Sequence, residues 1–285
     1  MANPAALHNQ FQRDGYIVAR ELFPREDTAA YCAHYMQLNQ PGAHPNELVN
    51  QWDDGAPDPL RQYPRLMNMH HWDDLSRQWL LDDRLRQYLT TILGREPYAI
   101  QTMIYFKPPG SRGQALHQAQ YYLRAHPGTS IAAWMALEEI DVANGCLQLV
   151  PGTQDIPLIC PVAADATASF TNIAVPLPAE LNPVPIELSP GDVLFFNGQI
   201  VHGSFPNTTA DRFRRALVGH YIEGHARRVA AFDHPVLRMD GTVATELGNS
   251  PNGGKCGDWV DRDGAQLVDV KQVFQSGTLD TTAIP

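Results

Sequence analysis

The sequence predicts a mainly β protein with a helical N-terminal part, in which the strands form a jelly roll or another β-sandwich. Two observations predict this fold class. Apolar residues recur at helical spacing in residues 1–97, whereas from residue 98 onwards short runs of β-forming residues alternate with Pro and Gly turns. No internal repeat or linker divides the chain, so we expect one domain of residues 1–285, made of a helical part (1–97), a β core (98–222) and a C-terminal extension (223–285).

Three segments of the N-terminal part are predicted to be helical. Residues 3–20 begin as a short helix and run into the strand-like sequence YIVAR, and residues 27–39 have helical apolar spacing. Residues 73–94 are expected to form one helix that Gly94 ends, because these residues recur on one face: Trp79, Leu80, Leu85, Leu89 and Ile92. Residues 40–64 are rich in Pro, Asp and Gly and predict a loop.

The β core is predicted from short runs rich in β-branched and aromatic residues, which Pro and Gly separate. These runs are residues 98–107, 115–123, 130–140, 146–152, 184–198, 200–205 and 214–222. Beyond them, residues 248–260 are rich in Gly and predict a surface loop.

The composition is that of a folded enzyme that needs no covalent reinforcement. The chain has 285 residues, of which 44% are hydrophobic and 18% charged, and a chain of this length buries about 75% of its unfolded surface. Its four cysteines (Cys32, Cys146, Cys160 and Cys256) are widely spaced and form no CxxC motif. The N-terminus lacks the charged-then-apolar pattern of a signal peptide. We therefore expect free thiols in a cytoplasmic protein.

Charge and hydropathy exclude two classes of partner. The formal net charge of -10 argues against nucleic acid, because phosphate backbones are bound by clustered Lys and Arg side chains. No apolar run approaches the roughly 18 residues that suggest a membrane span. We expect a soluble protein that binds neither nucleic acid nor membrane.

Two of the eleven histidines lie where they could share a metal ion. His117 is in an alternating run in which positions 117 and 119 are expected to share one strand face. His202 follows a long apolar strand, from which a second imidazole could enter the same cavity. Two histidines and one carboxylate are the ligands of non-haem Fe(II) oxygenases, but position 119 is occupied by Ala119.

Residues 98–222 resemble the phytanoyl-CoA dioxygenase family of Fe(II)- and 2-oxoglutarate-dependent oxygenases. The likeness lies in several motifs in the family's order: MIYFKPPGSRGQALHQ (103–118), AAWMALEEIDVANGCLQLVPGT (132–153), LSPGDVLFFNGQIVHGSFPN (188–207) and RRAL (214–217). Residues 11–20 also resemble the family's start, whereas residues 223–285 match nothing that we can use. The resemblance implies a double-stranded β-helix that binds Fe(II), 2-oxoglutarate and O₂.

The resemblance also implies roles for single residues. His117 and His202 match the two iron histidines, and Arg214 matches the arginine that binds the far carboxylate of 2-oxoglutarate, with Ser204 beside it. Arg215 competes with Arg214 for that role, and strand alternation should turn only one of them inward. Lys107 and Trp134 match further positions on the cosubstrate side, although they could equally be a surface lysine and a core tryptophan.

The family pattern has Asp where this chain has Ala119, and a methyl group cannot bind iron. The arrangement resembles that of the aliphatic halogenases among these oxygenases, in which Ala or Gly replaces the carboxylate and chloride takes its place. That resemblance implies chlorination of an unactivated aliphatic C–H bond, by hydrogen abstraction and chloride rebound. The alternatives are a hydroxylase whose aspartate has been replaced by engineering or lost, a non-catalytic binding protein, and a substitute carboxylate from Glu138, Glu139 or Asp141.

The substrate is expected to be a small molecule, and the sequence leaves open whether a carrier protein holds it. Residues 40–70, 155–182 and 225–258 would line the pocket and contain no recognised motif. Several cationic or imidazole side chains could bind an anionic substrate, although such loop residues usually face water. They are Arg61, Arg65, His70, His71, Arg227 and Arg228.

Overall fold

The computed structural model describes residues 3–45, 59–178 and 181–250. The α-helices are α1 (Pro4–Asp14), α2 (Arg25–Leu38), α3 (Asp74–Leu80), α4 (Asp83–Leu93) and α5 (Gln120–Leu123), and the 3-10 turns are η2 (Pro59–Arg61), η3 (Met69–His71) and η4 (Ala231–Asp233). The strands are β1 (Tyr16–Ala19), β2 (Leu66–Met67), β3 (Tyr98–Tyr105), β4 (Gln114–His117), β5 (Ser130–Ala136), β6 (Leu147–Val150), β7 (Val162–Ala163), β8 (Ile173–Ala174), β9 (Val184–Ile186), β10 (Val193–Asn197), β11 (Val201–Ser204), β12 (Ala216–Ile222), β13 (Arg228–Val229), β14 (Leu237–Arg238) and β15 (Gly248–Asn249). The predicted mainly β fold with a helical N-terminal part is confirmed.

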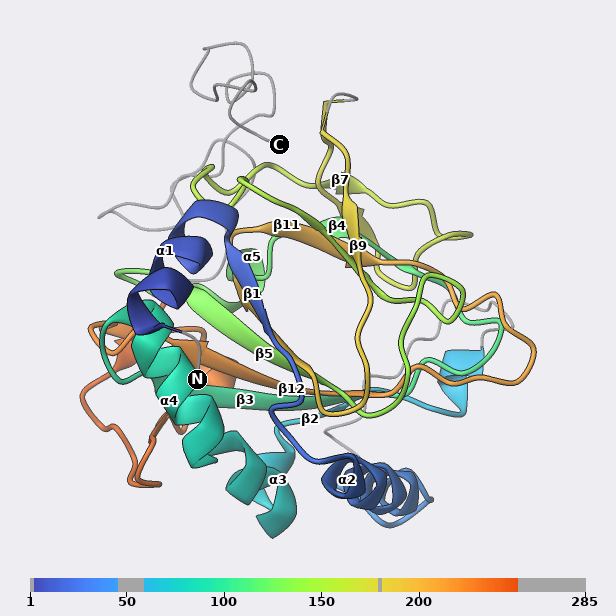
Figure 1. Cartoon of the computed structure of the whole chain (residues 1–285), viewed down its shortest axis with the longest axis horizontal. Helices are drawn as coiled ribbons and strands as arrows, with labels where there is room; N and C mark the ends of the chain where they lie inside the picture. Colours follow the sequence, from blue (N-terminus) through green and yellow to red (C-terminus); the bar gives the residue numbers. More distant parts are fainter. Residues whose placement is uncertain (1–2, 46–58, 179–180, 251–285) are drawn as a thin grey trace.

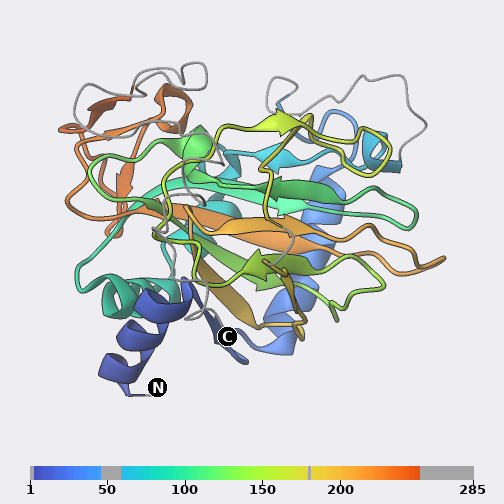
Figure 2. The ribbon, with the colours of Figure 1, turned by 90° about the horizontal axis from the view of Figure 1, so that it is seen from above.

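Most strands belong to two antiparallel sheets that face each other (Figure 1). The larger sheet has the order β1-β10-β5-β12-β3-β14, with β2 also paired to β3, and the smaller sheet has the order β4-β11-β6-β9. Two short pairs, β13-β15 and β7-β8, stand apart from them. Figure 2 shows the strands of both sheets running along the molecule, with the connecting loops gathered at its two ends.

The larger sheet is buried on both faces. Along β5, Ala133 and Met135 pack into the core that the sheet shares with helices α3 and α4, whereas Ala132, Trp134 and Ala136 pack into the core between the two sheets. Figure 1 shows α3 and α4 on the outer side of this sheet. Because adjacent strand residues point to opposite faces, every second residue of β5 faces the space between the sheets.

The prediction of one helix over residues 73–94 is wrong, because the segment forms α3 and α4. Leu81 leaves helical geometry (φ −101°, ψ 12°), and Asp82 is extended and accepts a hydrogen bond from the Arg84 backbone N at 2.8 Å. A carboxylate at this position satisfies a free N–H group of the first turn and so starts a new helix. Gly94 ends α4 in the left-handed conformation (φ 70°), as predicted.

The prediction of four free thiols is also wrong. Cys32 and Cys146 are free, whereas Cys160 is disulfide-bonded. Wide spacing along the sequence does not prevent two cysteines from meeting in the folded chain, because disulfide formation depends on the distance between Cα atoms in space. Cys256 lies outside the described residues.

Parts of two predicted loops also lie outside the described residues. They are residues 46–58 of the predicted loop 40–64 and residues 251–260 of the predicted loop 248–260. The described remainders include η2 in the first segment and β15 in the second.

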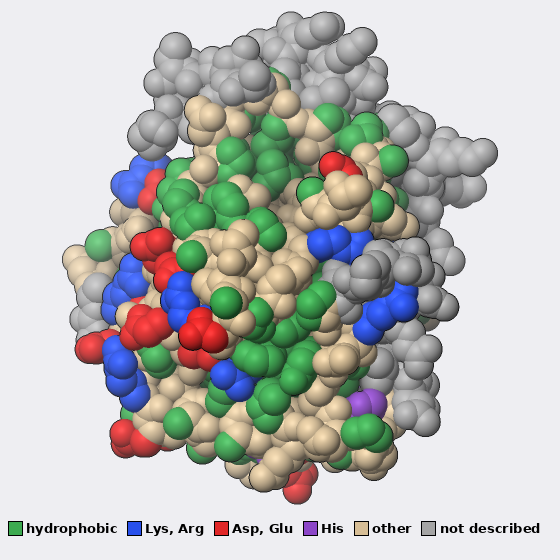
Figure 3. Space-filling view, turned by 90° about the vertical axis from the view of Figure 1, so that its right-hand side faces the viewer, with side chains coloured by type: hydrophobic (Ala, Val, Ile, Leu, Met, Phe, Trp, Pro, Cys, Tyr) green, Lys and Arg blue, Asp and Glu red, His purple; other side chains and the backbone are tan. Residues whose placement is uncertain are grey.

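The surface carries mixed charge where Figure 3 displays it. Acidic and basic side chains lie next to each other on one side of this face, and apolar and uncharged side chains cover much of its centre. In the part of the chain that the structure describes, no helix combines the length and the apolar character that crossing a bilayer requires.

Candidate active site

A cavity of about 320 Å³ lies between the two sheets. Six residues that the sequence predicts for the iron and cosubstrate sites line it together, namely His117, Ala119, Trp134, His202, Ser204 and Arg214. They come from β4, α5, β5, β11 and the segment before β12. The fold thus brings to one place side chains that are spread over almost a hundred residues of sequence.

The two histidines face each other across paired strands. His117 and His202 are register partners of β4 and β11, and their ring centroids lie 4.2 Å apart. Each ring hydrogen-bonds a backbone carbonyl through Nδ1, His117 to Ala115 O at 3.0 Å and His202 to Ile200 O at 2.9 Å. A carbonyl can only accept, so both Nδ1 atoms carry the proton and both Nε2 atoms are free of it.

Burial keeps both imidazoles neutral. It lowers the pKa of His117 to about 4. Burial, together with the neighbouring His117 ring, lowers the pKa of His202 well below its ordinary value. The side-chain amide nitrogen of Gln114 lies 3.2 Å from Nε2 of His117 and can donate a hydrogen bond to this unprotonated ring nitrogen. Two adjacent neutral imidazoles with unprotonated Nε2 atoms form a ligand pair suited to a divalent transition metal.

Ala119 lines the cavity as part of a helical turn, not of the predicted strand. The expected strand over residues 115–123 ends at His117, and Ala119 has helical geometry (φ −62°, ψ −31°) at the start of α5. The premise that 117 and 119 share a strand face is therefore wrong. A tight helical turn places the methyl group of Ala119 on the cavity wall instead.

Gln118 and Gln120 do not line the cavity. The Gln118 amide donates to two backbone carbonyls and accepts from the Ile159 backbone N at 2.8 Å. Gln120 donates to Ala125 O at 2.7 Å and accepts from the Ser130 backbone N at 3.1 Å. These bonds anchor loops on either side of α5 and hold the Gln118 and Gln120 amides outside the cavity.

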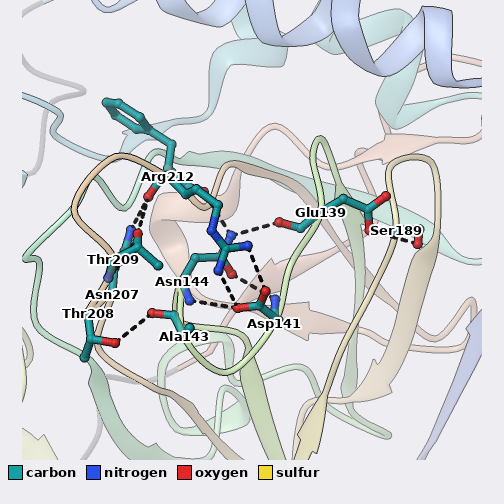
Figure 4. Close-up of polar contacts among 10 residues, drawn as sticks. Glu139, Asp141, Ala143, Asn144, Ser189, Asn207, Thr208, Thr209 and Arg212 are labelled. Atoms are coloured by element: carbon teal, nitrogen blue, oxygen red, sulfur yellow. Dashed lines mark hydrogen bonds and ion pairs between the residues drawn. The ribbon is translucent and has the colours of Figure 1, made fainter.

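None of the three carboxylates considered as a substitute lies in the cavity. Each is paired elsewhere: Glu138 with Arg215 at 2.8 Å, Glu139 with Arg25 at 3.2 Å and Asp141 with Arg212 at 2.7 Å. Figure 4 shows Asp141 in a polar network at a turn. Among the described residues, no group of three His, Cys, Asp or Glu side chains could hold a metal ion together. The place beside the two histidines is bounded by the methyl group of Ala119.

Arg214 and Arg215 have opposite environments. Arg214 is 2% exposed, lines the cavity and forms no ion pair within the described residues, and burial lowers its pKa to about 10. Its guanidinium lies 5.4 Å from the centroid of the Trp134 ring. Arg215 forms a bidentate pair with Glu138, with N–O distances of 3.0 and 2.8 Å. Of the two, Arg214 is therefore available to an anion in the cavity.

Lys107 and Ser204 form a buried pair. Lys107 is 2% exposed, which excludes the alternative of a surface lysine, and its Nζ donates to Ser204 Oγ at 2.9 Å and to Phe205 O. Lys107 does not line the main cavity but lies behind Ser204, in a small adjoining cavity that it shares with Arg214. Trp134 is 3% exposed and faces inward between the sheets.

Several cavity residues carry no signal that the sequence reasoning detected. They are Gln101, Met103, Tyr105, Gln114, Tyr122, Phe196, Val218 and His220. His220 is register partner to Gln101 across β12 and β3, and burial lowers its pKa to about 3. Strand parity could have found it, because positions 216, 218 and 220 alternate inward as Arg214 does. Of the side chains considered for an anionic substrate, Arg65 lines the cavity and donates to Tyr105 Oη at 2.8 Å.

Comparisons with known proteins agree with this geometry. The family model described as Phytanoyl-CoA dioxygenase (PhyH) matches residues 11–216. Phytanoyl-CoA dioxygenase 1 of Oryza sativa subsp. japonica is 28% identical over 156 residues, which are 54% of this chain and 55% of that protein. The chain thus spans about half the length of this relative.

Solved structures share the fold. The S. alaskensis protein EctD, crystallised with 2-oxoglutarate and 5-hydroxyectoine, superposes with a TM-score of 0.64 at 21% identity, covering 88% of this chain and 90% of that one. The epimerase SnoN, in complex with Fe³⁺, α-ketoglutarate and nogalamycin RO, gives a TM-score of 0.60 at 22% identity, covering 93% and 96%. The family model matches most of the chain, and this match shows that the chain belongs to the phytanoyl-CoA dioxygenase (PhyH) family.

Proposed function

We propose that this protein is an Fe(II)- and 2-oxoglutarate-dependent halogenase that chlorinates an aliphatic C–H bond of a small molecule. The observation that carries the proposal is Ala119, which lies on the cavity wall with His117 and His202 where the family pattern has an iron-binding aspartate. No carboxylate among the described residues replaces that aspartate. A site of this kind has room for a halide next to the metal.

The histidine pair fits a ferrous ion. His117 and His202 would hold it through Nε2, because both Nδ1 atoms are bonded to backbone carbonyls and burial keeps both rings neutral. Without a protein carboxylate, iron held by two neutral imidazoles lacks one negative charge and one ligand. A chloride beside Ala119 would supply both.

The other end of the cavity fits 2-oxoglutarate. Arg214 is a buried cation without a carboxylate partner in the described part of the chain, and an isolated buried charge is costly unless a ligand neutralises it. Arg214 would bind the far carboxylate, and the Ser204 hydroxyl, which Lys107 already contacts, would lie beside it. Trp134 would cover the chain of the cosubstrate from the larger sheet.

When bound, iron, 2-oxoglutarate and O₂ supply the oxidant that removes a hydrogen atom from an aliphatic carbon, and chloride supplies the atom that replaces it. The protein's contribution is positioning. The cavity walls hold the substrate carbon, and its distance from the halide decides between chlorination and hydroxylation. The two sheets that enclose the cavity would form a double-stranded β-helix within a single domain.

Hydroxylation is the second candidate, and family membership favours it, because the matched relative is named a dioxygenase. In that case water would complete the metal site. Chloride separates the two candidates. Only a halogenase would have a specific binding place for a halide.

The test is an anaerobic titration of the protein with Fe(II) and 2-oxoglutarate, with and without chloride. A halogenase should show a metal-to-cosubstrate absorption band that chloride shifts or tightens. Ala119→Gly serves as the matched control, since it keeps the place vacant and should keep the response, whereas Ala119→Asp should abolish it. If chloride leaves the band of the unmodified protein unchanged while Ala119→Asp raises hydroxylation, the halogenase proposal is wrong.

A further inference from the structure

A turn between β5 and β6, buried at Asn144 and Gly145, holds the backbone next to Arg214. In this turn, residues 141–145, Asn144 is fully buried. Asn144 and Asp141 are joined by two hydrogen bonds, Asp141 N to Asn144 Oδ1 at 2.8 Å and Asn144 N to Asp141 Oδ1 at 3.0 Å. Figure 4 shows this reciprocal pair at the centre of the network. The amide of Asn144 therefore has one fixed orientation.

The Asn144 amide nitrogen reaches the segment that carries Arg214. Its Nδ2 donates to Glu139 O at 2.8 Å and to Phe213 O at 3.0 Å, and Phe213 directly precedes Arg214. The Arg214 backbone N donates in turn to Lys107 O at 3.0 Å. Phe213 O and Arg214 N belong to the peptide group that precedes the Arg214 Cα, so both polar atoms of this group are held by hydrogen bonds, which restricts where the Arg214 side chain can start.

The next residue of the turn restricts where the guanidinium can point. Arg214 Nε donates to Gly145 O at 3.0 Å, so the edge that carries the two Nη atoms is left for a ligand. Gly145 has φ +93°, and a Cβ there would lie 2.8 Å from Phe205 O and 2.9 Å from Lys107 Cε. A side chain at position 145 would therefore collide with these groups and displace the turn that carries this carbonyl.

We infer that Asn144 and Gly145 are positioning residues that aim the Nη edge of Arg214 at the far carboxylate of 2-oxoglutarate. The inference rests on the proposed function. It predicts that the turn governs selectivity for a 2-oxo acid with a second carboxylate, without governing affinity for the 2-oxo acid group itself.

The experiment compares 2-oxoglutarate with 2-oxovalerate, which has a methyl group in place of the far carboxylate. Both are titrated anaerobically into the Fe(II)-loaded protein, and the dissociation constants are read from the absorption band. The unmodified protein should prefer 2-oxoglutarate. In Asn144→Ala this preference should fall about tenfold, because the variant binds 2-oxoglutarate more weakly while its affinity for 2-oxovalerate stays the same. A displaced guanidinium cannot keep bidentate geometry with the far carboxylate.

Arg212→Met is the matched control. It breaks the Arg212–Asp141 ion pair on the same turn, whose side chains are 41% and 39% exposed, and should change the preference by less than about twofold. Fe(II) affinity, which depends on His117 and His202, should stay unchanged in both variants. If Asn144→Ala does not fold, Asn144→Ser, which retains an acceptor for the Asp141 N–H, serves in its place.

Two kinds of result overturn the inference. If the Asn144 variants weaken both acids equally, or leave the preference intact, Asn144 does not position Arg214. If the unmodified protein binds 2-oxovalerate as tightly as 2-oxoglutarate, or binds neither, the proposed function fails and the inference fails with it.

Discussion

Arg214 and Arg215 are adjacent cations whose replacement by methionine should have opposite consequences. Methionine keeps the length of the side chain and removes the charge. Arg214 lies in the cavity without a carboxylate partner among the described residues, whereas Arg215 is paired with Glu138. We expect Arg214→Met to damage cosubstrate binding and Arg215→Met to damage stability.

The binding loss follows from the free edge of Arg214. Its Nε is bonded to Gly145 O, so a carboxylate would meet the two Nη atoms. A hydrogen bond to a charged group contributes about 1.5 to 3 kcal/mol. Losing that contribution should lower the affinity for 2-oxoglutarate by roughly 10- to 150-fold. Arg215→Met should leave the affinity within about threefold, because its guanidinium is engaged outside the cavity.

The stability of the metal-free protein should change in the opposite order. Burial lowers the pKa of Arg214 from 12.5 to about 10, which corresponds to a cost of about 3 kcal/mol for keeping the charge in the fold. Removing it relieves that cost but leaves Gly145 O without its donor, at a loss of about 1 to 3 kcal/mol. The net change should be near zero. Arg215→Met leaves Glu138 half-buried and unpaired, and should lower the free energy of unfolding by about 1 to 3 kcal/mol.

The assays are an anaerobic 2-oxoglutarate titration and urea unfolding of the metal-free proteins. The assignment of Arg214 is refuted if Arg215→Met weakens 2-oxoglutarate more than Arg214→Met does. It is also refuted if Arg214→Met binds 2-oxoglutarate normally.

Three further predictions concern stability. Burial lowers the pKa of His70 from 6.5 to about 3, so the ring is neutral in the folded protein. The free energy of unfolding should therefore fall by about 1.4 kcal/mol for each pH unit below 6.5, because the unfolded chain takes up a proton there. His70→Gln should remove about 2 kcal/mol of the difference between the free energies of unfolding at pH 7 and pH 5, measured with urea, and an unchanged difference would contradict the low pKa. Asp82→Ala removes the cap of α4 and should lower the free energy of unfolding by about 1 kcal/mol, with Asp83→Ala, which caps nothing, as the control. Leu89→Ala empties a fully buried site between α4 and the larger sheet and should cost about 2 to 5 kcal/mol; a melting temperature equal to that of the unmodified protein would show that this core is not close-packed.

The sequence predicted the elements whose signals are local. The period change near residue 98 separated most of the helices from most of the strands, and Gly94 marked a helix end because glycine adopts the left-handed conformation without strain. The run 115–123 failed because a short apolar segment is compatible with either structure. There the hydrogen bonds of Gln118 and Gln120 to distant loops decide for a helical turn after His117.

The sequence predicted only part of the candidate site, because the other part depends on contacts between distant segments. His117, His202 and Arg214 lie in motifs that the sequence displays, and the structure brings them to one cavity. Gln101 and His220 lie there too, but only the pairing of β3 with β12 makes them neighbours. That pairing joins residues more than a hundred positions apart, and no local pattern encodes it. Cys160 was misjudged on the same ground, since its bond depends on proximity in space.

Strand β1 forms one edge of the larger sheet. β1 pairs with β10 through four register partners, from Tyr16 with Phe196 to Ala19 with Val193. During synthesis, β1 can therefore pair with β10 only after most of the β core has emerged from the ribosome. A variant that lacks β1 would expose the backbone donors and acceptors of β10 that β1 pairs with, and such an edge can template aggregation. Affinity tags and fusion partners are accordingly better joined ahead of α1 by a flexible spacer than substituted for the first residues.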